Sequence, residues 1–121
     1  SVNNLSFFGI TYKKNTSTLR RSIPFEIVQY FSKNFSIKIH DPHADWNSIR
    51  INDSIIICSD IISTCKNTDL VIILTGWDNY KKFNWNLALK QMNKNIFFDT
   101  QNFLNEKKIS KMGFKYYGIG R

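Results

Sequence analysis

A short polar segment of the sequence, residues 11–21, gathers four basic side chains and contains no acidic residue. The four cations are Lys13, Lys14, Arg20 and Arg21. A helix is expected to begin directly afterwards, because Ser22 suits an N-cap and Pro24 suits the first helical turn. Amide groups at a helix N-terminus carry partial positive charge and bind phosphate. The spacing therefore indicates an anion site, while a solvated basic loop without a specific ligand stays open as the simpler interpretation.

The fingerprint of a dinucleotide-binding strand–helix unit, G-x-G-x-x-G, is absent after the first predicted strand. Gly9 is followed there by Ile10, Thr11 and Tyr12. A G-x-G occurs at 118–120, where no helix is predicted to follow. We therefore expect this segment not to bind NAD in the Rossmann manner.

Patterns for metal binding and nucleophilic catalysis are weak. His40 and His43 lie close to aspartates, but no third strong ligand has a suitable spacing. Cys58 and Cys65 form no C-x-x-C pair, and buried cysteines are most often packing residues. The sequence predicts neither a metal site nor a catalytic residue.

The overall charge of the chain allows a second class of ligand. The 121 residues carry a formal net charge of +8, which attracts nucleic acid, acidic membrane surfaces or phosphorylated small molecules. Aromatic residues between positions 77 and 85 interleave with Lys81 and Lys82, a combination that can hold single-stranded nucleic acid. The same residues can instead pack against a core. A stand-alone basic module that binds nucleic acid therefore stays an alternative.

Short apolar runs alternate with helical patterns along the chain, which predicts an α/β fold. We expect one domain, residues 1–121, with a three-layer Rossmann-like architecture, a mostly parallel sheet of about five strands and helices on both faces. Strands are predicted at 5–10, 35–40, 54–58, 70–75, 95–99 and 114–119. Helices are predicted at 22–33, 60–67, 85–92 and 103–112. No apolar run reaches the roughly 20 residues of a membrane span, and Ser1–Ile10 does not resemble a signal peptide. Ligands of such sheets bind at the carboxyl ends of the strands, which selects the loops 11–21, 41–45, 75–80 and 100–103.

Five sequence blocks add a family resemblance. They are G-I-T-Y-K-K-N-T-S-T-L-R-R-S at 9–22, a strand ending in Asp41-Pro42, D-L-V-I-I-L-T-G-W at 69–77, F-F-D-T-Q-N at 97–102 and G-F-K-Y-Y-G-I-G-R at 113–121. In this order, and over nearly the whole chain, they resemble the C-terminal UDP-binding domain of UDP-glucose/GDP-mannose dehydrogenases.

The resemblance implies the substrate domain of an NAD-dependent enzyme, such as a UDP-glucose 6-dehydrogenase, that oxidises the sugar C6 hydroxyl to a carboxylate for polysaccharide biosynthesis. NAD would be bound by a separate N-terminal domain that also carries the catalytic cysteine, so this segment alone would be inactive. The implied partners are a UDP-sugar, the N-terminal and central domains and a second enzyme subunit. The implied setting is the cytoplasm, without a membrane and without nucleic acid.

Individual residues carry over from these blocks. Tyr12 and Lys13 match an aromatic–lysine pair that contacts the substrate near its sugar and diphosphate, and Arg20 matches a loop arginine. Gln101 falls where the family has an arginine that reaches the substrate, so a neutral amide replaces a fixed charge. Gly76 stands in place of a glutamate. These two departures keep a third interpretation open, a structural or dimerisation domain with a degenerate nucleotide site. Neither the sugar nor the choice between UDP and GDP follows from the sequence.

Overall fold

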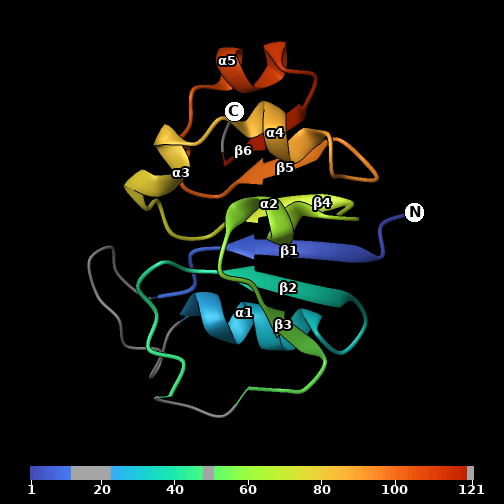
Figure 1. Ribbon diagram of the computed structural model, residues 1–121, viewed down its shortest axis with the longest axis vertical. Helices are drawn as coiled ribbons and strands as arrows, with labels where there is room; N and C mark the ends of the chain where they lie inside the picture. Colours follow the sequence, from blue (N-terminus) through green and yellow to red (C-terminus); the bar gives the residue numbers. More distant parts are fainter. Residues whose placement is uncertain (12–22, 48–50, 120–121) are drawn as a thin grey trace.

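The computed structural model describes residues 1–11, 23–47 and 51–119, and its centre is one parallel β-sheet (Figure 1). Six strands follow the order β3-β2-β1-β4-β5-β6, and each described pair of neighbours is parallel. The strands are β1 (Asn4–Phe8), β2 (Ser36–His40), β3 (Ile55–Ile57), β4 (Leu70–Ile73), β5 (Ile96–Asp99) and β6 (Lys115–Gly118). The predicted α/β class is confirmed, with six strands where about five were expected.

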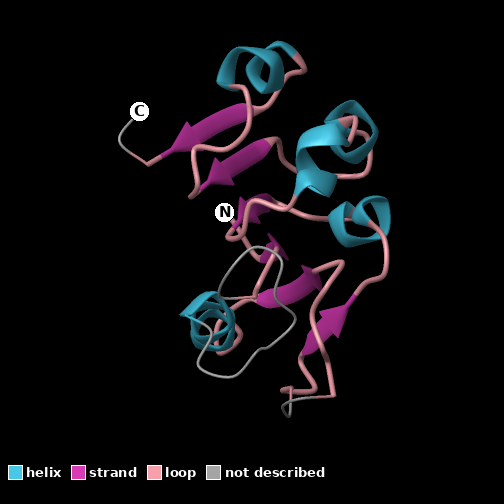
Figure 2. Ribbon diagram, turned by 90° about the vertical axis from the view of Figure 1, so that its left-hand side faces the viewer, coloured by secondary structure: helices cyan, strands magenta, loops and turns pink. Residues whose placement is uncertain are grey.

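Helices cover both faces of the sheet, as Figure 2 shows. The helices are α1 (Ile23–Phe31), α2 (Ile61–Cys65), α3 (Asp78–Lys82), α4 (Trp85–Leu89) and α5 (Glu106–Lys111). Helix α1 packs on one face through Phe25 and Val28, and the other four helices contribute to the core on the opposite face. The predicted three-layer arrangement is therefore confirmed.

Neighbouring residues of the central strands enter opposite layers of the core. Phe7 and Ile72 are buried on the α1 side, whereas Phe8 and Ile73 are buried on the other side. The ring of Phe8 packs edge-on against Trp85, with ring centroids 5.3 Å apart. Strands buried on both faces read as unbroken apolar runs, which is why β1 and β4 are conspicuous in the sequence.

Several predicted boundaries were wrong. Helix α3 begins inside the predicted 75–80 loop, because a five-residue helix is too short to show a 3.6-residue period. Its ends carry Asp78 in the first turn and Lys81 and Lys82 in the last, which favours a short helix through the macrodipole. Helix α4 ends at Leu89 and not at Met92.

The strand order creates a topological switch point between β1 and β4. These two strands are neighbours, yet β1 is followed by α1 on one face and β4 by α3 and α4 on the other. The chain therefore leaves their carboxyl ends in opposite directions. In open α/β sheets such a crevice is where ligands bind.

Candidate functional site

The carboxyl ends of β1 and β4 approach each other at Gly9. The backbone of Gly9 has φ +79°, and a Cβ placed there would lie 2.6 Å from the carbonyl oxygen of Thr75. Its amide donates to the His40 carbonyl over 2.9 Å, while Leu74 N donates to the Phe8 carbonyl over 2.9 Å. Only glycine combines this conformation with this close approach. Gly9 thus joins the ends of three neighbouring strands at the switch point.

All the polar groups of Thr11, the first residue of the basic 11–21 segment, form hydrogen bonds within the chain. The Asp41 carboxylate oxygen Oδ2 accepts from Thr11 N over 3.2 Å and from Thr11 Oγ1 over 3.3 Å. The hydroxyl of Thr75 donates to the Thr11 carbonyl over 2.7 Å. Asp41 Oδ2 also accepts from Ile10 N at 2.8 Å and from Trp77 Nε1 at 3.2 Å. One buried carboxylate therefore ties together the loops that follow β1, β2 and β4.

A cavity of about 360 Å³ opens beside this clamp, between the start of α1 and the carboxyl ends of β4 and β5. Its described lining is Ile23, Pro24, Leu74, Thr75, Gly76, Gln101 and Phe103. Because Gly76 has no side chain, the Phe103 ring lies against its backbone, where a Cβ would come within 3.1 Å of the ring. The ammonium group of Lys81 lies 4.8 Å from the centre of the same ring, within cation–π range.

The structure places one of the four predicted site residues. Gln101 lines the cavity, is exposed, and donates from Nε2 to Thr100 Oγ1 over 3.4 Å. Tyr12, Lys13 and Arg20 lie outside the described residues, as does the predicted N-cap Ser22. Gly76, the other departure from the family pattern, lines the same cavity as Gln101.

The residues at the switch point do not fit NAD. A dinucleotide site uses three closely spaced glycines after the first strand and a free acidic side chain for the ribose. Here Ile10 and Thr11 follow Gly9, and Asp41 already accepts four hydrogen bonds at Oδ2 and one from His43 N at Oδ1. The acidic group is therefore used by the chain itself.

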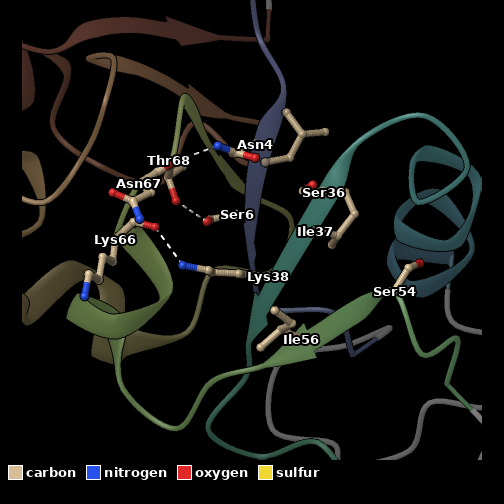
Figure 3. Close-up of a pocket in the computed structure, with 11 residues that line it drawn as sticks. Asn4, Ser6, Ser36, Ile37, Lys38, Ser54, Ile56, Lys66, Asn67 and Thr68 are labelled. Atoms are coloured by element: carbon tan, nitrogen blue, oxygen red, sulfur yellow. Dashed lines mark hydrogen bonds between the residues drawn. The ribbon is translucent and has the colours of Figure 1, made fainter.

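A second hollow, of about 290 Å³, lies toward the amino ends of β1 and β2 (Figure 3). Lys38 donates from Nζ to the Lys66 carbonyl over 2.7 Å, and the Ser6 hydroxyl donates to the Thr64 carbonyl over 2.6 Å. The Lys66 side chain points away from Lys38 (Figure 3). Several polar groups of this hollow are thus already hydrogen-bonded within the chain, and the hollow lies at the end of the strands opposite the switch point.

Burial shifts the protonation of several groups near the site. Desolvation lowers the pKa of His40 below its ordinary value, partly offset by the charge of Asp41. Desolvation likewise raises the pKa of Tyr80, whose hydroxyl donates to the His40 carbonyl over 3.0 Å. Burial also raises the pKa of Cys65 to about 12, which suits a packing residue and not a thiolate nucleophile. Within residues 1–11, 23–47 and 51–119, no group of three His, Cys, Asp or Glu side chains could hold a metal ion.

Sequence reasoning missed the residues that organise the site, Thr11, Asp41, Thr75 and Asp99. The available signal was an aspartate at the carboxyl end of a predicted strand, as in Asp41-Pro42 and Asp99-Thr100. Such an aspartate can hydrogen-bond the amides of the following loop, but the pattern does not say which amides it reaches.

Comparisons with known proteins agree with this architecture. A family model described as "UDP-glucose/GDP-mannose dehydrogenase family, UDP binding domain" matches residues 6–106. The UDP-glucose 6-dehydrogenase of Rickettsia prowazekii is 28% identical over 120 residues, covering 97% of this chain and 28% of that protein. The UDP-N-acetyl-D-mannosamine dehydrogenase of Methanocaldococcus jannaschii is 32% identical over 124 residues, covering 98% of this chain and 27% of that protein.

Solved structures share the fold. The UDP-D-ManNAc dehydrogenase of Pyrococcus horikoshii superposes with a TM-score of 0.78 at 22% identity, covering 100% of this chain and 26% of that one. The NDP-N-acetyl-D-galactosaminuronic acid dehydrogenase of Methanosarcina mazei gives a TM-score of 0.80 at 22% identity, covering 100% of this chain and 25% of that one.

This chain thus spans about a quarter of the length of these relatives. No helix among its described residues is both long enough and apolar enough to cross a membrane. Because the family model matches residues 6–106 of the 121, the chain belongs to the UDP-glucose/GDP-mannose dehydrogenase family and corresponds to its UDP-binding domain.

Proposed function

We propose that residues 1–121 form the UDP-sugar-binding domain of an NAD-dependent dehydrogenase that oxidises the sugar C6 hydroxyl to a carboxylate. The observation that carries the proposal is the switch-point crevice, where Gly9 and Thr75 bring two strand ends together beside a cavity. The clamp holds Thr11, the residue that precedes residues 12–22 in the sequence, beside this crevice.

Each proposed site residue has a distinct role. Lys13 and Arg20 neutralise the diphosphate, because charge-assisted hydrogen bonds to phosphate are the strong ones. Tyr12 packs against the neighbouring sugar. Gln101 offers an uncharged amide from the cavity wall, which hydrogen-bonds neutral groups of the ligand such as sugar hydroxyls. Holding the diphosphate in this way positions the reacting sugar carbon for chemistry performed elsewhere in the enzyme.

The remaining parts of the reaction belong, in this proposal, to other segments of a larger cytoplasmic enzyme. NAD and the catalytic cysteine are supplied by an N-terminal domain, and the enzyme pairs with a second subunit. An apolar hollow of about 460 Å³ between α1 and strands β4 and β5, lined among others by Phe31, Ile72 and Phe98, supports contact with further protein on that face.

The test is a calorimetric titration of the protein with UDP and with UDP-glucose. Replacing Lys13 by alanine removes a charge-assisted hydrogen bond worth about 1.5–3 kcal/mol, so the dissociation constant for UDP should rise roughly 10- to 150-fold. The matched control is Lys66→Ala, which removes the same charge from an exposed side chain near the amino ends of the strands, away from the switch point. Equal affinities for UDP in the Lys13 variant and the wild type would contradict the proposed role.

The nucleic-acid alternative gives a different result in the same instrument. A single-stranded oligonucleotide would bind more tightly than UDP, and its affinity would fall steeply between 50 and 200 mM salt, by roughly 300-fold for six phosphate contacts. No observation among the described residues favours this alternative. Absence of any uridine nucleotide binding would instead favour a structural domain with a degenerate site.

A further inference from the structure

Asp99, at the carboxyl end of β5, is fully buried and is surrounded by hydrogen-bond donors. Its Oδ2 accepts from Phe103 N over 2.8 Å, from Leu104 N over 2.7 Å and from the Tyr116 hydroxyl over 2.8 Å. Its Oδ1 accepts from Gln101 N over 3.0 Å. All four partners are N–H or O–H groups, which is the acceptor-only pattern of an ionised carboxylate.

The loop from Thr100 to Leu104 curls around this carboxylate. Asn102 adopts the left-handed region, with φ at 49°, which turns the chain back toward Asp99. The other side of the loop is tied to β4, because Thr100 donates from N and from Oγ1 to the Ile73 carbonyl, over 3.1 Å and 2.6 Å. The loop is therefore fixed to two strands and to one buried side chain.

This loop supplies one wall of the cavity at the switch point, through Gln101 and Phe103. Both residues have their backbone amides bound to Asp99. The amides of Phe103 and Leu104 could otherwise face an anion, but the carboxylate already occupies them. These two amides are therefore unavailable to a phosphate group, which favours contact of this wall with an uncharged part of a ligand.

We propose that Asp99 is the positioning residue of this cavity: its carboxylate holds the 100–104 loop so that Gln101 and Phe103 face the ligand. The inference rests on the proposed function, since it concerns the same UDP-sugar site. It adds that the wall held by Asp99 contacts the sugar part of the ligand.

Asp69 provides a control at the opposite end of the strands, directly before β4. It is also a buried aspartate, and its Oδ2 accepts from Asn3 N over 2.9 Å and from Asn4 N over 3.0 Å. Replacing Asp99 by asparagine keeps the shape but places an NH₂ group against a backbone N–H in either orientation, because both carboxylate oxygens accept from one. In Asp69→Asn the amide oxygen can still accept from Asn3 N and Asn4 N, because both bonds use Oδ2, so this variant mainly removes the charge. Asp99→Asn should therefore lose more thermal stability, and only Asp99→Asn should disturb the cavity.

The experiment compares UDP-glucose with UDP by calorimetry in the wild type, Asp99→Asn, Asp69→Asn, Gln101→Ala and the Asp99/Gln101 double variant. We expect Asp99→Asn to weaken UDP-glucose about tenfold and UDP less than threefold, and Asp69→Asn to change neither by more than twofold. In the Gln101→Ala background the added effect of Asp99→Asn on UDP-glucose should shrink to less than threefold, while its effect on the melting temperature persists.

Two results would overturn the inference alone: equal losses for Asp99→Asn and Asp69→Asn, or an undiminished Asp99→Asn effect in the Gln101→Ala background. A wild type that binds neither ligand would instead overturn the proposed function, and the inference with it. If Asp99→Asn fails to fold, Tyr116→Phe removes one donor from the carboxylate, and it should weaken UDP-glucose about threefold in the same direction. An unchanged affinity in that variant would then count against the positioning role.

Discussion

Replacing Gly9 by alanine tests the close approach of β1 and β4 at the switch point. The new methyl group would lie 2.6 Å from the Thr75 carbonyl oxygen, in a backbone with φ +79°. The left-handed conformation costs a non-glycine residue about 1–2 kcal/mol, and forcing a methyl group into a packed site costs about 1–3 kcal/mol more. The free energy of unfolding should therefore fall by about 2–5 kcal/mol.

Gly113 separates the two causes of this loss. It also has positive φ, +111°, but a Cβ there would meet only the Leu89 side chain, at 3.4 Å. Gly113→Ala should therefore lose only the conformational part, about 1–2 kcal/mol. A domain of this size has a free energy of unfolding of about 6–18 kcal/mol. This exceeds the loss expected in either variant, so both variants should stay folded at 25 °C.

Urea unfolding followed by circular dichroism measures both losses. The Gly9 variant should also bind UDP more weakly, because its methyl group displaces Thr75 and with it the hydrogen bond to the Thr11 carbonyl. The Gly113 variant should keep its affinity. Equal unfolding free energies in the two variants would refute the claim that strand contact at Thr75 requires glycine.

Two further predictions follow from buried groups. The folded-state pKa of His40 lies below its ordinary value of 6.5, so the unfolded chain binds more protons at mildly acidic pH. The free energy of unfolding should therefore fall as the pH drops below about 6.5 and level off below the folded-state pKa. Urea titrations from pH 8 to 5 should show a smaller decrease in His40→Gln, and an equal decrease in the variant and the wild type would contradict this origin. Cys65 is fully buried with its pKa raised to about 12, whereas Cys58 is half-buried. An aromatic disulfide reagent at pH 8 should therefore modify Cys58 first and Cys65 only on unfolding. Equal modification rates for the two thiols in the native protein would contradict the packing role of Cys65.

Strands were easier to predict than helices in this chain. The runs at Leu70–Leu74 and Asn95–Asp99 are apolar because both faces of the sheet are covered, and this signal needs only a few residues. Helices α2, α3 and α4 have five residues each, so their burial pattern spans little more than one turn. Helix α3 was missed for that reason, although the caps of α2 and α4, Asp60 and Asn84, are recognisable in the sequence.

The sequence directs attention to a place for the site but not to its details. The rule for parallel sheets selects the carboxyl ends of the strands, where Gln101 lines a cavity, and the role of Gln101 in binding stays a prediction. The roles of Asp41 and Asp99 depend on contacts between loops far apart in sequence, such as Asp41 with Trp77 and Asp99 with Tyr116. Local patterns carry no information on such pairs. The Gly76 departure acquires a physical reason only when Phe103 is seen against it.

The most direct measurement is a UDP titration of the isotope-labelled protein followed by amide chemical shifts. The account predicts shifts at the switch point, for Gly9, Thr11, Thr75 and Gly76, with little change at Ser6 and Thr68 in the opposite hollow. Shifts concentrated at Ser6 and Thr68, or none at saturating UDP, would contradict the claim that the crevice between β1 and β4 holds the nucleotide.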